Sequence, residues 1–81
     1  MHKILFICHG NICRSPMAEF LLKDIVRKRG IANEFEIASA ATSREEIGNP
    51  VHHGTKHKLA QLGISVAGKT ARQVTTRDYR Y

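Results

Sequence analysis

The sequence contains no long apolar run and has only two cysteines in 81 residues. No stretch approaches the roughly 18 apolar residues that a membrane-spanning helix needs, so we expect no membrane partner. Residues 1–3 lead directly into a short apolar stretch and do not resemble a signal peptide. One of the two cysteines is a candidate reactive thiol, which suggests a reducing compartment. We therefore expect a cytoplasmic protein.

Aromatic residues are also scarce, and none is interleaved with the basic residues. The net charge of +6 could attract nucleic acid or another anionic partner. Base stacking, however, needs aromatic side chains among the cations. Four of the cations also fall in the last two turns of an expected helix, whose end favours positive charge: Lys23, Arg27, Lys28 and Arg29. We expect no nucleic-acid partner.

The most informative stretch is residues 8–15, Cys-His-Gly-Asn-Ile-Cys-Arg-Ser, between an apolar run and an expected helix. The N-terminus of a helix presents unpaired N–H groups and a partial positive charge to an anion. Gly10 and Asn11 tolerate unusual backbone angles, so the loop can curl its N–H groups inward. Arg14 can bind two phosphate oxygens with its planar guanidinium. We expect Ser15 to cap the helix and Pro16 to occupy its first position.

Cys8 stands at the start of this loop and suggests covalent chemistry. A thiol near a helix N-terminus and a guanidinium should have a lowered pKa, and its thiolate is a nucleophile. The Ser15 hydroxyl could donate a hydrogen bond to that thiolate. The alternative is that Cys8 is a buried residue at a strand end and Arg14 a surface charge. The apolar strand before the loop and the Ser-Pro pair after it favour the phosphate site.

Residues 8–19 resemble, almost residue for residue, the phosphate-binding loop and first helix of the low-molecular-weight protein tyrosine phosphatases. The resemblance implies that Cys8 attacks phosphorus to form a phosphocysteine, that Arg14 binds equatorial oxygens and that Ser15 tunes the thiolate. It also implies that Asn11 holds the shape of the loop. The residues implied to bind phosphate are His9, Gly10, Asn11, Ile12, Cys13 and Arg14.

The resemblance also implies the partners. The substrate would be a phosphotyrosine-containing protein or a small aryl phosphate, and inorganic phosphate would be released. No cofactor and no metal are expected. In the family, the loop at residues 42–50 borders the entrance and often carries an aromatic residue, whereas residues 41–47 contain none.

The pattern predicts an α/β fold with a parallel sheet and flanking helices, the three-layer sandwich of the family, incomplete in this chain. We expect strands over 3–7 and 34–41, a helix from Pro16 to about Arg29, a second helix over 51–62 and an extended piece over 64–66. The first helix should bury one set of side chains: Met17, Ala18, Leu21, Leu22, Ile25 and Val26. A second set should face solvent: Glu19, Lys23, Asp24, Arg27 and Lys28.

The family is nearly twice as long as this sequence, so we expect residues 1–81 to form a single partial domain, its N-terminal half. Only two of the family's four parallel strands are expected. The apolar first strand should have neighbours on both sides, and an unpaired strand edge favours pairing with another chain. We therefore expect self-association into a homo-oligomer through exposed strand edges.

The family's general acid is an aspartate from its C-terminal half. Asp24 lies about 13 Å along the helix from Ser15, at about 1.5 Å per residue. Asp78 resembles a residue with a different role. Two alternatives to the enzyme therefore remain: a catalytically impaired phosphate- or oxyanion-binding module that lacks the general acid, and an arsenate-reductase-like redox protein resting on Cys8 and Cys13.

Cys13 and the histidines allow further interpretations. Cys13 could form a reversible disulfide with Cys8, or it could be a small buried residue; the sequence favours neither. His53 and His57 would share one face of a helix, a spacing found in zinc sites. No third ligand is recognisable beside these two or His52, so we expect solvated histidines and no metal site.

Overall fold

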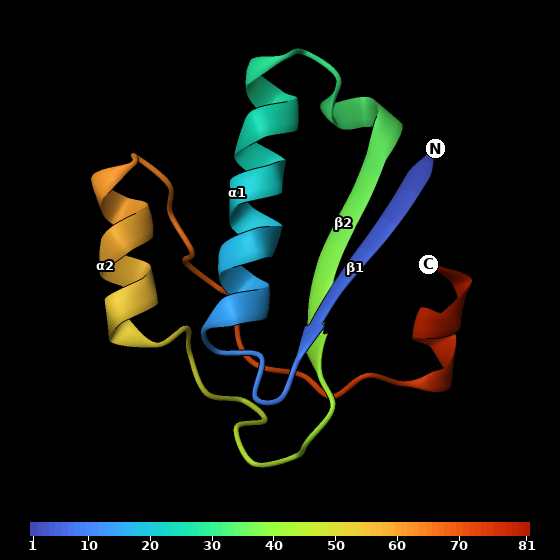
Figure 1. The fold of residues 1–81 in the computed structure, drawn as a ribbon, viewed down its shortest axis with the longest axis vertical. Helices are drawn as coiled ribbons and strands as arrows, with labels where there is room; N and C mark the ends of the chain where they lie inside the picture. The colour runs from blue at the N-terminus through green and yellow to red at the C-terminus, as the bar shows by residue number, and fades with distance from the viewer.

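The computed structural model describes residues 1–81, apart from the side chain of Arg80. The main elements are β1 (His2–Cys8), α1 (Arg14–Lys28), β2 (Phe35–Ala41) and α2 (His53–Gln61). Two 3₁₀ turns complete the order: η1 (Ala32–Glu34) precedes β2, and η2 (Thr76–Arg80) lies near the C-terminus. Figure 1 shows the two strands side by side, with α1 next to them and α2 beyond α1.

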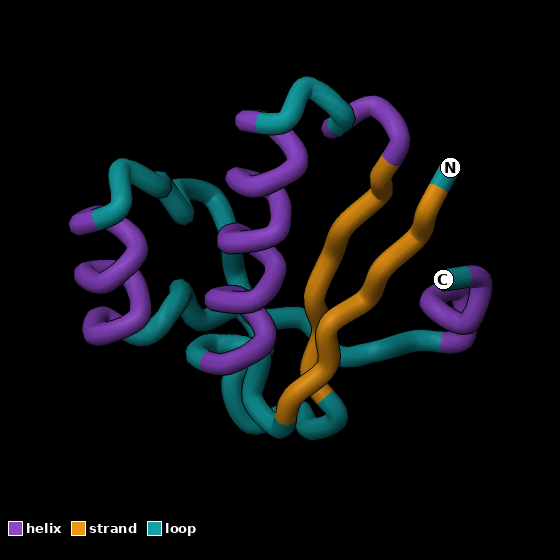
Figure 2. The backbone as a smooth tube through the Cα atoms, turned by 45° about the horizontal axis from the view of Figure 1, so that its top comes forward, coloured by secondary structure: helices purple, strands orange, loops and turns teal.

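β1 and β2 pair in parallel, with His2 opposite Phe35 and Cys8 opposite Ala41. Parallel strands need a crossover connection, and α1 provides it. Both strands therefore end at the same edge of the sheet, from which the loop to α1 begins (Figure 2). The predicted α/β class and the strand–helix–strand unit are confirmed, and the sheet of the described residues has two strands.

The side of α1 that packs on the sheet differs from the prediction at two positions. Glu19, which we expected in solvent, is buried with 4% of its surface exposed, while Ile25 is 48% exposed. Ser15, Glu19 and Val26 are all buried along one line of the helix. Ile25 lies about 120° around the helix from Glu19 at 3.6 residues per turn. The buried line is therefore partly polar, because Glu19 faces a polar partner, Ser39 of β2.

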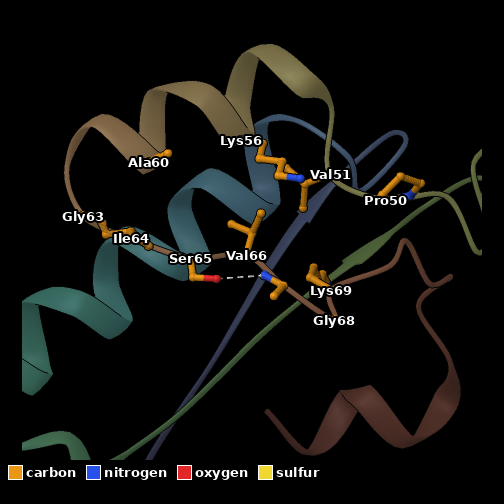
Figure 3. Close-up of a pocket in the computed structure, with 11 residues that line it drawn as sticks. Pro50, Val51, Lys56, Ala60, Gly63, Ile64, Ser65, Val66, Gly68 and Lys69 are labelled. Atoms are coloured by element: carbon orange, nitrogen blue, oxygen red, sulfur yellow. Dashed lines mark hydrogen bonds between the residues drawn. The ribbon is translucent and has the colours of Figure 1, made fainter.

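A small apolar cluster joins α1 to α2. Val51, Leu59 and Val66 form its buried centre. Partly buried side chains pack against this centre: Met17, Phe20, Leu21 and Ile64. The predicted apolar face of α1 is thus confirmed where it meets α2. Figure 3 shows a pocket between α2 and residues 63–69, lined by Val51, Val66 and Lys69 among others.

The predicted ends of the elements are partly confirmed. α2 begins at His53, two residues later than expected, because the His52 side chain accepts the Gly54 N–H and caps the helix. Gly30 and Gly63 follow the ends of the two helices with φ of 71° and 76°, the left-handed geometry that glycine favours there. Residues 64–66, where an extended piece is expected, belong to no helix or strand, and Val66 is buried there.

The two edges of the sheet differ. Beside β2, Ala41 donates its N–H to Arg72 O at 2.7 Å, and Val74 donates to Ala41 O at 2.8 Å. Residues 72–74 thus extend the sheet at the end of β2. Among the described residues no strand pairs with the other edge of β1, where Ile7 is 49% exposed. No helix in the described part of the chain has the length and apolarity to cross a membrane.

Candidate phosphate-binding site

The candidate site lies in the loop between Cys8, the last residue of β1, and Arg14, the first residue of α1. Asn11 is fully buried and has φ of 58°, so the predicted unusual backbone angle is confirmed there. Gly10 has no positive φ. A side chain at Gly10 would place Cβ 3.3 Å from Glu46 Cγ, so this position is restricted by space.

Cys8 is surrounded by hydrogen-bond donors. Its Sγ lies 3.0 Å from Ser15 Oγ and accepts the Asn11 N–H at 3.3 Å. Burial opposes ionisation of the thiol, but the Ser15 hydroxyl and the backbone N–H groups of Ser15, Asn11 and Gly10 outweigh it. The pKa of Cys8 is therefore lowered from its ordinary value, as the sequence predicted.

The expected cap by Ser15 is wrong. Cys13 is the N-cap residue of α1 and its side chain makes no capping hydrogen bond, and Pro16 is the third residue of the helix instead of the first. The Ser15 hydroxyl is engaged elsewhere, with Cys8 and with Asn11 Nδ2 at 2.8 Å. Because no side chain caps α1, the N–H groups of its first turn are left for an anion.

Asn11 connects the loop to two distant segments. Its Nδ2 donates to Ser15 Oγ and, at 2.9 Å, to Ser39 Oγ in β2. Its Oδ1 accepts the backbone N–H of Arg72 at 3.1 Å. A buried amide with these three partners fixes the loop to β2 and to residues 71–74.

Behind Asn11 lies a buried charged group that our sequence analysis missed. Ser39 donates its hydroxyl to Glu19 Oε1. Lys23 Nζ lies 2.6 Å from Glu19 Oε2, and Lys69 Nζ lies 3.6 Å from Oε1. Lys69 also donates to the backbone oxygen of Ser39 at 3.2 Å. The only signals in the sequence were a glutamate four residues after Ser15 and a serine within an alanine-rich strand.

The outer side of the loop contacts the start of α2. The His52 N–H donates to Ile12 O at 2.7 Å, and the Thr55 hydroxyl donates to Cys13 Sγ at 3.1 Å. Cys13 is exposed, so its interpretation as a small buried residue is wrong. Both thiols are free, and the disulfide with Cys8 stays a prediction. Arg14 is exposed and has no hydrogen bond or ion pair with any side chain that the structure describes.

The loop after β2 lies against the phosphate loop. Thr42 donates its N–H to Cys8 O at 3.0 Å, and Ser43 donates to His9 O at 3.1 Å. The exposed ring of His9 reaches Glu45, with 3.1 Å between Nε2 and Oε2. This rim is polar, as the missing aromatic residue indicated.

Asp78 is held in an ion pair. Arg72 binds its two carboxylate oxygens at 2.9 and 3.0 Å, and Thr75 donates its N–H to Oδ2 at 2.7 Å. The Arg72 hydrogen bonds, followed by that of the Thr75 backbone, lower the pKa of Asp78 to about 2. A carboxyl with this pKa is not a proton donor near neutral pH.

The histidines of α2 face one another or neighbouring groups. The rings of His52 and His53 lie 4.5 Å apart, and His57 Nε2 lies 3.2 Å from Gln61 Nε2. Among the side chains that the structure describes, no three potential ligands form a group that could hold a metal ion.

The sequence profile of the family described as "Low molecular weight phosphotyrosine protein phosphatase" matches residues 3–81. The low molecular weight protein-tyrosine-phosphatase YfkJ of Bacillus subtilis is 46% identical over 96% of this chain and 50% of its own length. The low molecular weight phosphotyrosine protein phosphatase of Gallus gallus is 43% identical over 95% of this chain and 48% of its own.

The fold comparison agrees with the sequence. The crystal structure of YfkJ matches 99% of this chain and 50% of its own, with a TM-score of 0.94 and 45% identity. The low molecular weight protein tyrosine phosphatase of Streptococcus pyogenes matches 99% of this chain and 51% of its own, with a TM-score of 0.87 and 44% identity. The chain spans about half the length of the curated relatives it matches. With the loop geometry, the profile match and these relatives in agreement, the chain belongs to the low-molecular-weight phosphotyrosine protein phosphatase family.

Proposed function

We propose that the chain carries the nucleophile and phosphate cradle of a phosphomonoester hydrolase, in which residues 1–81 are the N-terminal half of the domain. The environment of the Cys8 thiol carries this proposal: the Asn11 N–H and the Ser15 hydroxyl both contact its sulfur, and its pKa is lowered. A thiolate stabilised in this way is a nucleophile at neutral pH. The uncapped start of α1 and the unpaired Arg14 support a binding site for a dianion.

The reaction proceeds in two displacements at phosphorus. The Cys8 thiolate attacks the phosphorus of an aryl phosphate, the P–O bond to the leaving group breaks, and a phosphocysteine forms. Water then attacks the phosphorus, inorganic phosphate leaves, and the electron pair of the P–S bond returns to Cys8 as thiolate. The Ser15 hydroxyl stabilises the thiolate at the start and as the leaving group of the second step.

The phosphate oxygens are held by the loop during both steps. Arg14 binds two of the equatorial oxygens with its guanidinium, while inward-pointing N–H groups bind the charge that spreads over them. The residues that supply these groups are His9, Gly10, Asn11, Ile12, Cys13 and Arg14. No cofactor or metal takes part in these steps.

The leaving group of the first step needs a proton, and Asp78 does not provide it because Arg72 keeps it ionised. A positioned general acid typically contributes about 10²–10⁴-fold. We therefore expect this chain to hydrolyse esters with good leaving groups and to act weakly on alkyl phosphates. The proposed natural substrate is a phosphotyrosine-containing protein or a small aryl phosphate, in the cytoplasm.

The test is hydrolysis of p-nitrophenyl phosphate, whose leaving group needs little protonation. Wild-type protein should turn over, whereas Cys8→Ser should not. Arg14→Lys, which keeps the charge but loses the planar fork, should have a strongly raised KM and lowered kcat. Circular dichroism on each variant establishes that it is folded. If folded wild-type protein does not hydrolyse p-nitrophenyl phosphate, the proposal that this chain is an enzyme is wrong.

A second candidate function is binding of phosphate or an oxyanion without turnover. The ionised Asp78 favours it, because the described residues then contain no assigned general acid. Titration of inorganic phosphate followed by NMR of the loop amides would detect binding that is not accompanied by hydrolysis. An arsenate-reductase-like role would rest on Cys8 and Cys13, both of which are free thiols.

A further inference from the structure

The pocket between α2 and residues 63–69 lies outside the phosphate loop and shares no residue with it. Its volume of about 440 Å³ falls within the range of about 300–1,000 Å³ that is usual for small-molecule sites. Val51 and Val66 of the apolar cluster are among the lining residues, and Ala60 and Ile64 extend the apolar wall. A ligand that enters the pocket therefore removes an apolar body from water against a surface that is already formed.

The pocket carries positive charge and no negative charge. Residues 47–77 contain no aspartate or glutamate, and every residue that lines the pocket falls between 50 and 69. Two lysines, Lys56 and Lys69, are among the lining residues. A cleft that combines apolar walls with charge of one sign attracts a ligand of the opposite sign. The ligand that fits this pocket is thus an anion with an apolar body.

The two lysines differ in what their ammonium groups contact. Lys69 Nζ donates to Ser39 O at 3.2 Å and lies 3.6 Å from Glu19 Oε1. Lys56 is exposed, and no side chain in the described part of the chain forms a hydrogen bond or ion pair with it. Figure 3 shows the Lys56 side chain extending from α2 in the direction of Val51. Lys56 is therefore the cation that is available to a ligand.

Ser65 supplies a second polar group in the wall of the pocket. Its Oγ accepts the Ala67 N–H at 3.2 Å, the hydrogen bond that is dashed in Figure 3. A hydroxyl also has a hydrogen to donate, and Ser65 is exposed, so this hydrogen is available to a bound anion. One ammonium and one hydroxyl match the two oxygens of a carboxylate, whereas a phosphate dianion favours a larger set of donors, as in the phosphate loop.

We propose that this pocket is a second ligand site, which binds a small amphipathic carboxylate. The carboxylate accepts from the Lys56 ammonium and the Ser65 hydroxyl. The apolar body packs against Ala60 and Ile64. The site does not depend on chemistry at Cys8, because none of these residues belongs to the phosphate loop.

The test is a titration with octanoate, followed by NMR of the backbone amides and by thermal denaturation. Octanoate should shift the amide signals of residues 50–69 with a Kd on the order of a millimolar, and it should raise Tm because the pocket exists only in the folded chain. Octanamide has the same apolar chain without the charge and should bind about three- to fivefold more weakly. Acetate, which has no apolar chain, should not bind. Equal affinity for octanoate and octanamide would overturn the proposal.

Three variants test the residues of the site. Lys56→Gln removes the free ammonium and should weaken octanoate binding about three- to fivefold without changing octanamide binding. Lys58→Gln removes an equal charge from an exposed residue of α2 that does not line the pocket, and it should change neither affinity. Ala60→Trp should abolish binding of both ligands, because the indole fills the pocket from an exposed helix position. Circular dichroism establishes that each variant is folded.

Two results for these variants would contradict the site. One is wild-type octanoate affinity in folded Ala60→Trp, and the other is an equal loss of affinity in Lys56→Gln and Lys58→Gln. The second result would show that octanoate responds only to net charge. The Lys56→Gln comparison remains decisive if Ala60→Trp fails to fold.

Competition with inorganic phosphate separates this pocket from the phosphate loop. Phosphate should shift the amide signals of residues 8–15 without displacing octanoate, and Cys8→Ser should bind octanoate as wild-type protein does. Displacement of octanoate by phosphate would mean that both occupy the phosphate loop, and the second site would be wrong. Because the readout is binding, absence of p-nitrophenyl phosphate hydrolysis contradicts the enzyme proposal and leaves this one standing.

Discussion

The phosphate loop and the outer edge of β1 are built in contrasting ways. The loop is fixed to three other parts of the chain, because Asn11 is bonded to Ser15 of α1, Ser39 of β2 and the Arg72 backbone. Along the edge of β1, Ile7 is half exposed and no described strand is paired there. The contrast shows that hydrogen bonds within these 81 residues surround the Cys8 thiol, whereas β1, which carries Cys8, has an unpaired edge among the described residues.

We expect the largest effect on the phosphate loop from replacing Asn11. Asn11→Ala removes three hydrogen bonds and leaves the partly buried Arg72 N–H without its acceptor, at a backbone position with φ of 58°. We expect a loss of unfolding free energy of about 2–4 kcal/mol, measured by urea denaturation, and loss of phosphate binding.

Asn11→Gly is the matched variant, because glycine adopts the positive φ without strain. It should recover a part of the stability but not the lowered pKa of Cys8, since the amide is still missing. Equal stability of Asn11→Gly and wild-type protein would contradict the structural role of the amide.

The second prediction concerns Asp78. Its ion pair with Arg72 joins η2 to the residue whose backbone N–H binds Asn11 of the phosphate loop. Its pKa of about 2 in the folded protein lies below the value of about 3.9 in an unfolded chain. The ion pair therefore stabilises the fold above about pH 4, and this stabilisation is lost as the pH falls through 4 toward 2.

We expect Asp78→Asn to cost about 1–2 kcal/mol of unfolding free energy at pH 7, after allowance for the partial exposure of Arg72. The difference from wild-type protein should shrink toward zero near pH 2, as measured by urea denaturation at a series of pH values. Asp24→Asn, which breaks ion pairs with Arg27 and Lys28 within α1, serves as the control and should have a smaller effect. A difference that is independent of pH would contradict the assignment.

A substitution at the outer edge of β1 should have the smallest effect on the free energy of unfolding, but it should change the oligomeric state. We propose that the chain self-associates through this edge, and Ile7→Lys should reduce the mass measured by light scattering to that of a monomer. Ile25→Lys changes an equally exposed residue on α1 and should leave the mass unchanged. Cys8 alkylation should be the same in both variants. A wild-type monomer at all concentrations tested would contradict self-association.

The sequence predicted the loop well because its signals are local. The apolar strand, the Gly-Asn pair and the Cys8-to-Arg14 spacing all lie within a few residues of one another, and backbone preferences alone place them at one edge of the sheet. The prediction that Ser15 caps α1 is wrong because its hydroxyl contacts Cys8 and Asn11 instead, and residue spacing does not indicate these partners.

The errors on α1 have a similar origin. Helical periodicity placed Glu19 in solvent, because a carboxylate is rarely buried without a partner. Its partners are Ser39, 20 residues away, and Lys69, which comes from the connection after α2. Ile25 was expected in the core because it is apolar, but the surface it would cover faces neither the sheet nor the cluster at α2.

The sequence by itself thus determined the strand–loop–helix unit and the positions of Cys8 and Arg14 at its loop, since these depend on backbone preference and on residues adjacent in the chain. The tertiary structure decided what surrounds them: the burial of Glu19, the partners of the Ser15 hydroxyl and the pairing of Asp78 with Arg72. Hydrogen bonds between distant segments form only when the chain folds. They offset the cost of burying polar groups that the local sequence pattern places in solvent.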